Sequence, residues 1–166
     1  ELVADAGFVG LPNAGKSSLL NELTNAKAKV GNFQFTTLEP NLGSYYGYIL
    51  ADIPGLIEGA SEGKGLGHKF LRHIKRTKMI FHCVSAEDDV LESYNTIREE
   101  LKLYGGDIDT KPEVIVLTKT DTVSPEELNE KIKVLKKKNK EIIPVSIFDE
   151  DSLKNLKTFI SRQIQG

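Results

Sequence analysis

The stretch GLPNAGKS, Gly10 to Ser17, has the residue types and spacing of a phosphate-binding loop. It fits the pattern G-x-x-x-x-G-K-[ST] and lies between a predicted strand and a predicted helix, the context that the pattern requires. Glycines let the backbone approach a polyphosphate closely, so that successive N–H groups and the start of the helix face its negative charge. We expect Lys16 to reach the β- and γ-phosphates and the Ser17 hydroxyl to ligate Mg²⁺. The motif predicts a nucleoside triphosphate site without identifying the base, and its candidate binding residues are Gly10, Leu11, Pro12, Asn13, Ala14, Gly15, Lys16, Ser17 and Ser18.

A second candidate segment, DIPGLIEGA, begins at Asp52, directly after the apolar strand YILA. In open α/β folds ligands bind at the carboxyl ends of the strands. We therefore expect the Asp52 carboxylate to hold magnesium through water and the Gly55 N–H to meet the γ-phosphate. Many nucleotide switches of the Ras and Gα type place a glutamine just beyond this point to orient the attacking water. Here Leu56 and Ile57 follow, and neither can orient water by hydrogen bonding, so either the chain does not hydrolyse nucleotide or it uses another route.

The segment TKTD, Thr118 to Asp121, follows the buried-looking strand EVIVL and is a candidate base reader. A carboxylate at Asp121 can accept hydrogen bonds from guanine N1–H and from the exocyclic amine. Adenine offers no such pair of donors, so a mismatch would leave buried polar groups unpaired. Lys119 can lay its aliphatic stem along the base, and SIF (Ser146–Phe148) is expected to back the base through main-chain contacts. The candidate base-binding residues are Thr118, Lys119, Thr120, Asp121, Ser146, Ile147 and Phe148.

Strand-length apolar runs alternate along the chain with amphipathic segments, the βαβα rhythm of a mostly parallel sheet in an α/β protein. The short link around Gly47 predicts a hairpin and hence one antiparallel edge strand. The segment SPEEL predicts a helix start, with Ser124 as the cap and proline at the first position. The loops Lys27–Pro40 and Ile53–Gly65 are long enough to be functional. Strands are predicted at Val3–Val9, Asn41–Tyr46, Tyr48–Asp52, Met79–Ser85, Glu113–Thr118 and Glu141–Ser146, and helices at Lys16–Asn25, Leu66–Thr77, Val90–Tyr104, Ser124–Lys138 and Asp151–Gln163.

Composition bounds the class of protein. The 166 residues include 39% hydrophobic and 28% charged residues, which is ordinary for a soluble globular domain. The formal net charge of −2 gives no global attraction to nucleic acid or membranes. No apolar run approaches the roughly 20 residues needed to span a bilayer, and no signal peptide is visible. Cys83 is the only cysteine and lies in an apolar run, so we expect a buried, inert thiol and a cytoplasmic protein.

Together these motifs resemble the guanine-nucleotide domain of the Obg family of GTPases. GLPNAGKSSLL, FTTLEPNLG, DIPGLIEGASEGKGLGHKFLRHIKRT, TKTD and SIF occur in the family's order and cover the whole chain. The long stretch beginning DIPGLIEGA is the one that distinguishes Obg from other small GTPases. The resemblance implies a P-loop NTPase fold of the Ras-like type, with three layers and a six-stranded, mostly parallel sheet. It also implies that Thr37 is the second Mg²⁺ ligand and γ-phosphate sensor, beside Ser17 and Asp52. The first switch would be Phe35, Thr36, Thr37, Leu38 and Glu39, and the second would begin at Asp52, Ile53, Pro54 and Gly55 and reach about Thr77.

The sequence departs from the family pattern at several places. Thr118 stands where most members have asparagine, and we expect it to weaken the tie between the base loop and the P-loop. Ile147 replaces the usual alanine beside the base, so that the edge of the base is expected to be held less well. The hairpin at Gly47 looks shorter than usual. The chain begins ELVADAG without an initiator methionine and lacks the family's glycine-rich N-terminal domain, so we interpret residues 1–166 as a single G domain, monomeric in isolation, from a larger protein.

Leu56 in the glutamine position, together with Asn13 inside the P-loop, is similar to the GTPases that potassium activates. In those proteins a monovalent cation near the bridging phosphates does the electrostatic work of an arginine finger. We nominate Asn13 as its ligand, and Lys16, Thr37 and Gly55 as the other catalytic residues. The alternative is that Asn13 only shapes the loop by hydrogen-bonding backbone. The prediction is slow hydrolysis of GTP to GDP, faster in K⁺ than in Na⁺.

Competing functions remain open at this point. The leading hypothesis is a GTP-hydrolysing switch with Mg²⁺ as cofactor, whose family role lies in assembly of the large ribosomal subunit, with its rRNA and proteins, and in the stress response. A second is a nucleotide-sensing binding module with negligible hydrolysis, which Leu56 permits. A third, an ATP-preferring relative, is disfavoured by Asp121.

Overall fold

The fold is taken from a computed structural model, which describes residues 6–28, 41–45, 48–52, 77–104, 108–139 and 141–165. The strands are β1 (Ala6–Gly10), β2 (Asn41–Tyr45), β3 (Tyr48–Asp52), β4 (Met79–Ser85), β5 (Glu113–Thr118) and β6 (Ile142–Pro144). The helices are α1 (Lys16–Ala28), α3 (Val90–Tyr104), α4 (Pro125–Lys136) and α5 (Glu150–Gln165), with short 3₁₀ turns η2 (Ile108–Thr110) and η3 (Thr120–Thr122).

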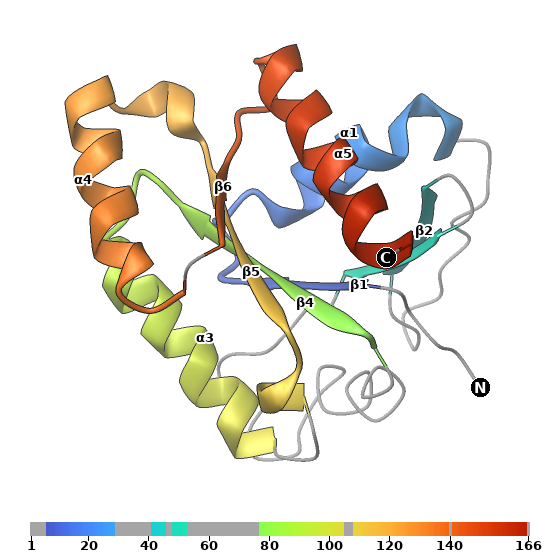
Figure 1. The fold of residues 1–166 in the computed structure, drawn as a ribbon, viewed down its shortest axis with the longest axis horizontal. Helices are drawn as coiled ribbons and strands as arrows, with labels where there is room; N and C mark the ends of the chain where they lie inside the picture. Colours follow the sequence, from blue (N-terminus) through green and yellow to red (C-terminus); the bar gives the residue numbers. More distant parts are fainter. Residues whose placement is uncertain are drawn as a thin grey trace.

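The strands form one sheet in the order β2-β3-β1-β4-β5-β6 (Figure 1). From β3 to β6 all neighbours run parallel. The predicted hairpin is observed, because β2 pairs antiparallel with β3 and Tyr45 lies opposite Tyr48. Since parallel strands end at one edge of a sheet, the segments that follow β1, β4 and β5 lie next to one another in that order.

Helices cover both faces of the sheet, α1 and α5 on one and α3 and α4 on the other (Figure 1). Strand β5 shows why both faces are needed, because its side chains alternate and are apolar on each side. Val114 and Val116 pack in the cluster that contains α1 and α5. Ile115 and Leu117 pack in the cluster that contains α3 and α4. Each face buries a separate apolar core, as a three-layer α/β protein requires.

Most predicted boundaries lie close to the observed ones, with differences at particular ends. β1 continues to Gly10, and its predicted first residues lie outside the described part. α1 extends past Asn25 to Ala28, through alanine and lysine, which favour helix. Thr77 is not helical, and the rest of the helix predicted at Leu66–Thr77 lies outside the described residues.

The last strand is shorter than predicted at both ends, although the Val145 N–H still donates to the Leu117 carbonyl of β5 at 2.8 Å. The Glu141 N–H donates to Asn139 Oδ1 at 2.8 Å, and the Ser146 N–H donates to Ser152 Oγ at 3.0 Å. Pro144 has no N–H to add to the ladder. The β6 strand spans only Ile142–Pro144, and the chain turns at Ser146.

Other local predictions are confirmed. The Ser124 side chain accepts a hydrogen bond from the Glu127 N–H at 3.1 Å and caps α4, with Pro125 at its first position. Cys83 is buried and forms no disulfide. Among the described residues, no helix combines the length and apolar character that crossing a bilayer demands.

Candidate nucleotide site

The loop between β1 and α1 has a geometry that requires its glycines. A Cβ on Gly10 would lie 2.7 Å from the main-chain oxygen of Cys83 on the neighbouring strand, so a side chain cannot be placed there without a shift. Gly15 has φ +78°, a left-handed conformation that favours glycine. The Ala14 N–H closes the turn by donating to the Leu11 carbonyl at 2.9 Å. Lys16 follows as the first residue of α1 and is buried, so the loop delivers the chain into a helix N-terminus as the motif predicts.

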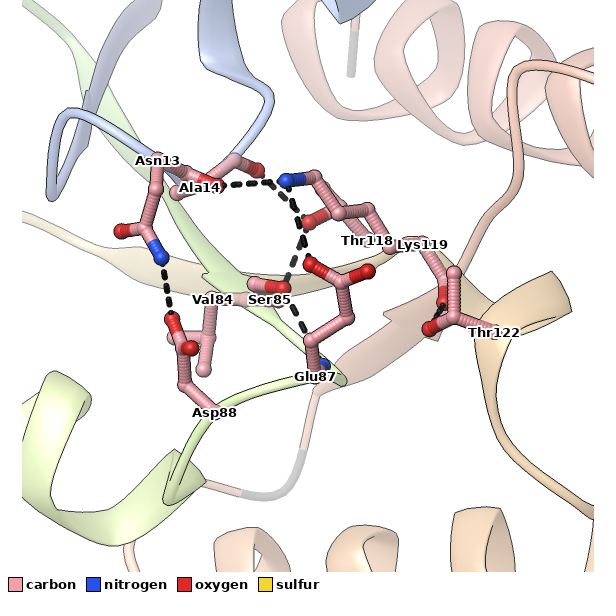
Figure 2. A network of polar contacts seen from close by, with 9 residues as sticks. All are labelled: Asn13, Ala14, Val84, Ser85, Glu87, Asp88, Thr118, Lys119 and Thr122. Carbon is pink, nitrogen blue, oxygen red and sulfur yellow. Dashed lines mark hydrogen bonds and ion pairs between the residues drawn. The ribbon is translucent and has the colours of Figure 1, made fainter.

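Thr118, the last residue of β5, ties the base loop to the P-loop. Its buried hydroxyl donates to the Ala14 carbonyl at 2.6 Å, and the Val84 carbonyl lies 3.3 Å from the same oxygen (Figure 2). The Thr118 carbonyl in turn accepts from the Ala86 N–H at 2.8 Å. Thr118, which we expected to weaken the connection between the base loop and the P-loop, thus forms a direct hydrogen bond between them. A hydroxyl has one proton where an amide has two, so Thr118 reaches this carbonyl with its only side-chain donor.

Lys119 forms the second link between these loops. Its ammonium donates to the Asn13 carbonyl at 2.8 Å and lies 3.4 Å from a Glu87 carboxylate oxygen (Figure 2). Its backbone is left-handed, with φ 58° and ψ 37°, a conformation that costs a non-glycine residue about 1–2 kcal/mol. The Thr122 hydroxyl and N–H both bond the Lys119 carbonyl, at 2.6 and 3.1 Å, and hold this turn.

Asp121 and Ser146 join the base loop to the segment after β6. The Ser146 hydroxyl donates to Asp121 Oδ1 at 2.8 Å and accepts from the Phe148 N–H at 3.1 Å. Ser146 is fully buried, whereas Asp121 is exposed. The Thr120 N–H adds a longer bond of 3.4 Å to the Val145 carbonyl. The carboxylate thus has one oxygen fixed by a buried hydroxyl, which orients the side chain that was predicted to read the base.

These loops surround a pocket of about 250 Å³. Its wall combines aliphatic side chains with the polar groups of the base loop. The lining residues are Gly15, Ser18, Leu19, Glu87, Thr118, Lys119, Asp121, Thr122, Val145, Ile147 and Phe148. The pocket therefore brings together P-loop, base-loop and SIF residues that lie far apart in the sequence.

Glu87 and Asp88, which follow β4, belong to the site but were not predicted from the sequence. The Asn13 amide donates to Asp88 Oδ2 at 2.8 Å, so Asn13 bonds a carboxylate and not only backbone (Figure 2). The Asp88 carbonyl accepts from the Lys131 ammonium at 2.7 Å, which fixes its backbone against α4. A signal for these residues exists, because the acidic run EDD comes directly after a buried strand and one alanine, at the carboxyl edge where ligands bind.

The remaining candidates are placed only in part. Ser17 and Ser18 are exposed in the first turn of α1. Asp52 ends β3, and its Cα lies beside that of Phe8 on β1, so its backbone belongs to the same edge of the sheet. The first switch, Phe35 to Glu39, and the residues Ile53, Pro54 and Gly55 lie outside the described part of the chain.

Comparison with known proteins identifies related chains. The family described as 50S ribosome-binding GTPase matches residues 5–119. GTPase Obg of Alkaliphilus oremlandii is 45% identical over 99% of this chain and 41% of its own length. GTPase Obg 2 of Anaplasma marginale is 46% identical over 99% of this chain and 52% of its own length. The chain thus spans about half the length of these curated relatives.

A solved structure shares the fold. The crystal structure of Era with MgGDPNP and a segment of 16S ribosomal RNA superimposes with a TM-score of 0.64 and 26% identity. The match covers 98% of this chain and 56% of that one. The α/β architecture described above is therefore that of a P-loop GTPase.

Proposed function

Because this chain belongs to the family of 50S ribosome-binding GTPases, we propose that it binds GTP with Mg²⁺ and hydrolyses it slowly to GDP and phosphate. The predicted resemblance to the Obg family is confirmed by 45–46% identity to two Obg GTPases over 99% of the chain. The main support for this proposal is that the P-loop, the base loop and the segment after β6 are hydrogen-bonded around one pocket. Thr118 and Lys119 bond the carbonyls of Ala14 and Asn13, and Ser146 bonds Asp121.

The base pocket supports guanine over adenine. Ser146 donates to one oxygen of the Asp121 carboxylate and fixes its orientation. The carboxylate remains a charged acceptor for the base. Guanine offers N1–H and an exocyclic amine to such a group, and adenine offers an unprotonated N1 instead. Lys119 lies along the same pocket wall, where its aliphatic stem can cover a base.

The phosphate and magnesium site is proposed at the start of α1. Gly15 and the helix N-terminus direct N–H groups toward a polyphosphate, and Lys16 follows at once. The donor set fits Mg²⁺, because the Ser17 hydroxyl and the Asp52 and Thr37 side chains are oxygen ligands, and Ser17 is exposed at this edge. When bound, the ion would neutralise charge on the β- and γ-phosphates.

We further propose that potassium stimulates hydrolysis through Asn13. Asp88 accepts the Asn13 amide hydrogen at 2.8 Å, and an ionised carboxylate accepts only. The amide oxygen is therefore turned away from Asp88 and remains the group that can ligate a cation. Leu56 cannot orient water, so a second source of transition-state stabilisation is needed if the chain turns over.

Phosphate release over many turnovers tests this proposal. GTP is supplied in KCl and then in NaCl at matched ionic strength, with Asn13→Ala beside the wild type. We expect turnover in KCl to exceed that in NaCl about 10-fold or more, since removing one preorganised electrostatic contact costs roughly 10²–10³ in rate at the strongest sites. Asn13→Ala should abolish the difference, whereas Asn95→Ala, an exposed asparagine on α3, should keep it. Equal rates in both salts would contradict the role of potassium.

A second candidate function is a nucleotide-sensing module with negligible hydrolysis, which the apolar Leu56 favours. In that case GDP and GTP bind but phosphate release stays at background in both salts. Preference for ADP over GDP would instead favour the ATP-binding alternative.

For the full-length protein we propose a cytoplasmic role in large ribosomal subunit assembly and the stress response, in which residues 1–166 form the single, monomeric G domain. The family's description names 50S binding. Co-sedimentation of the full-length protein with 50S subunits tests the partner. We expect binding with a non-hydrolysable GTP analogue and release with GDP, and equal binding in both states would contradict a switch.

A further inference from the structure

The carboxyl end of α4 carries a group of lysines that the nucleotide site does not use. Lys133 and Lys136 lie in the last turn of the helix, and Lys137 and Lys138 follow it. All four side chains are exposed, and we call them the α4 basic cluster. A helix dipole favours cations in the last turn, but the cluster continues beyond that turn. It is a local positive surface on a chain whose net charge is −2.

The fold places the α4 basic cluster at the opposite edge of the sheet from the nucleotide pocket. Helix α4 begins after η3, which follows the carboxyl end of β5. Because β6 runs parallel to β5, α4 must return the chain to the amino edge before β6 can begin (Figure 1). A ligand that binds the cluster is therefore separate from one that contacts Thr118 and Asp121.

The charges of the cluster are barely neutralised within the part of the chain that the structure describes. There, Lys133 is the one member with a carboxylate nearby, since its ammonium lies 3.8 Å from Glu130 Oε2. Both side chains of that pair are more than two-thirds exposed, and such pairs contribute little. Lys131 differs, because it donates to the Asp88 carbonyl at 2.7 Å and lies 3.7 Å from Glu127. The cluster is thus left available to an external anion.

The backbone that carries the cluster is fixed by hydrogen bonds. The Lys138 and Asn139 N–H groups donate to the carbonyl of the buried Leu135 at 2.8 and 3.0 Å. The Asn139 side chain donates to the Glu113 carbonyl at 2.8 Å and ties this turn to β5. Binding at the cluster therefore does not have to order the backbone first, which lowers its entropic cost.

The residue types of the cluster fit a phosphate backbone better than other anionic partners. A helix that lies on a membrane needs an exposed apolar face, but the apolar side chains of α4, such as Ile132 and Leu135, pack in the core. Carboxylates are bound best by the planar fork of arginine, and residues 131–139 contain none. The same segment has no aromatic residue to stack on a base. Lysines bind phosphate as point charges, without reading the sequence.

From this arrangement we infer that the α4 basic cluster binds the phosphate backbone of RNA, whatever its sequence and whichever guanine nucleotide is bound. The inference rests on the proposed role at the large ribosomal subunit, which supplies the RNA, and it assigns a surface for that contact. Positions 133, 136 and 137 share one helix face, so their ammonium groups can meet neighbouring phosphates. Any dependence of subunit binding on GTP would then come from other contacts.

The salt dependence of RNA binding tests the inference. The probe is a fluorescent RNA duplex of about 16 base pairs, titrated with the chain of residues 1–166 between about 50 and 200 mM KCl and followed by anisotropy. Each neutralised phosphate releases counterions, so four lysines predict a slope of log K against log[salt] of about −3 to −4. We expect the same slope with GDP and with a non-hydrolysable GTP analogue.

Variants of the cluster locate the contact. Lys137→Gln should bind the duplex about 5-fold more weakly and reduce the steepness of the slope by about 1. The triple variant Lys136→Gln/Lys137→Gln/Lys138→Gln should lose about 100-fold. Lys154→Gln, which removes the same charge from an exposed site on α5, is the matched control and should bind RNA as the wild type does. Unchanged GDP binding in calorimetry shows that each variant is folded.

Several results would overturn the inference. One is a wild-type chain that does not bind the duplex, and another is equal weakening by Lys137→Gln and Lys154→Gln, because the net charge would then be responsible. Phosphatidylserine vesicles that bind as tightly as the duplex would indicate a membrane partner instead.

The proposed function is read out separately. A chain that binds RNA through the cluster but does not bind GDP would contradict the proposed function and leave the inference standing. Full-length protein that sediments with 50S subunits equally well with and without the triple substitution would overturn the inference alone.

Discussion

The two ends of strand β5 use polar residues in opposite ways. At its carboxyl end, Thr118 bonds the Ala14 carbonyl of the P-loop and lies beside a pocket. At its amino end, Glu113 is surrounded by other polar side chains below α3. His82 lies 2.9 Å from one carboxylate oxygen, and the Tyr94 hydroxyl and an Arg98 nitrogen lie 3.2 and 3.6 Å from the other.

The amino-end cluster is neutralised internally. Burial raises the pKa of Glu113, but the hydrogen bond and charge of His82 and the charge of Arg98 outweigh it, so the pKa ends below its ordinary value. Burial, and then the charge of Glu113, raise the pKa of Tyr94 to about 12. His82 is fully buried and stacks on the Tyr94 ring, with centroids 5.0 Å apart.

Buried polar residues alone therefore do not mark a functional site. The carboxyl-end groups join different loops, since Thr118 bonds the Ala14 carbonyl and Ser146 bonds Asp121, so their side chains shape a cavity between those loops. The amino-end groups bond one another, so they stabilise the packing of α3 on the sheet. Four substitutions test this division.

The largest effect is expected for Asp121→Asn, which should bind GDP about 100-fold more weakly. The neutral amide replaces charge-assisted hydrogen bonds worth about 1.5–3 kcal/mol each. The introduced amide keeps a carbonyl oxygen for Ser146, so the melting temperature should not fall. Calorimetry with GDP measures the loss, and xanthosine diphosphate should gain affinity, because the amide can donate to its C2 carbonyl. Asp149→Asn removes the same charge nearby, where Asp149 caps α5, and should leave GDP binding intact.

Glu113→Gln should reduce stability by about 2 kcal/mol, because a mostly buried carboxylate with charged partners is lost. GDP affinity should stay the same, since Glu113 is at the far end of the strand from Thr118.

The pH dependence of the stability contributed by Glu113 follows from its lowered pKa. Glu113 contributes stability above its ordinary value of 4.5, and this contribution is lost as the pH falls below it. In denaturant unfolding from pH 7 to 3, the free energy of unfolding should therefore fall less steeply in the variant than in the wild type. A change in GDP affinity would contradict the separation between the two ends of β5.

Thr118→Val keeps the shape of the side chain but removes its hydroxyl. It leaves the Ala14 carbonyl without this donor, at a cost of about 1–1.5 kcal/mol. Since that carbonyl belongs to the P-loop, we expect a roughly 5-fold loss of GDP affinity together with a small fall in stability. Thr96→Val is the matched control, because the Thr96 hydroxyl bonds a carbonyl within its own helix. A loss of stability with no loss of affinity would place Thr118 with the amino-end cluster.

Glu87→Gln should have the smallest effect, within about 0.5 kcal/mol in stability and in GDP binding, because exposed ion pairs contribute little. The Glu87 side chain is 46% exposed and its Lys119 partner 34% exposed. The 2.8 Å bond from Lys119 to the Asn13 carbonyl should persist. A large loss of GDP affinity in calorimetry would show that Glu87 acts on the nucleotide itself.

Much of the fold and part of the site could be predicted because the signals are local. Each predicted signal acts within a few residues of a strand or helix end, as for Gly10, Gly15, Asp121 and Ser124. Glu87 and Asp88 could not be placed without the sheet order. Once β4 is known to lie between β1 and β5, the loop after β4 must lie between the P-loop and the base loop.

The His82–Glu113 pair escaped prediction for a related reason. His82 lies opposite Ile115 and not Glu113, so the contact is diagonal between neighbouring strands and depends on their register. Register is set by packing on both faces of the sheet, so it cannot be predicted from the sequence of either strand alone. The sequence showed a histidine in a strand, and the structure shows its partner.

We propose that the carboxyl-end loops form a guanine-nucleotide pocket. Competition between GDP and ADP for the wild-type chain, measured by calorimetry in Mg²⁺ and KCl, tests it most directly. The arrangement of Asp121, Ser146 and Lys119 predicts tight GDP binding with ADP at least about 100-fold weaker, because ADP leaves the carboxylate without its donors. Equal affinity for the two nucleotides would contradict a guanine-specific pocket.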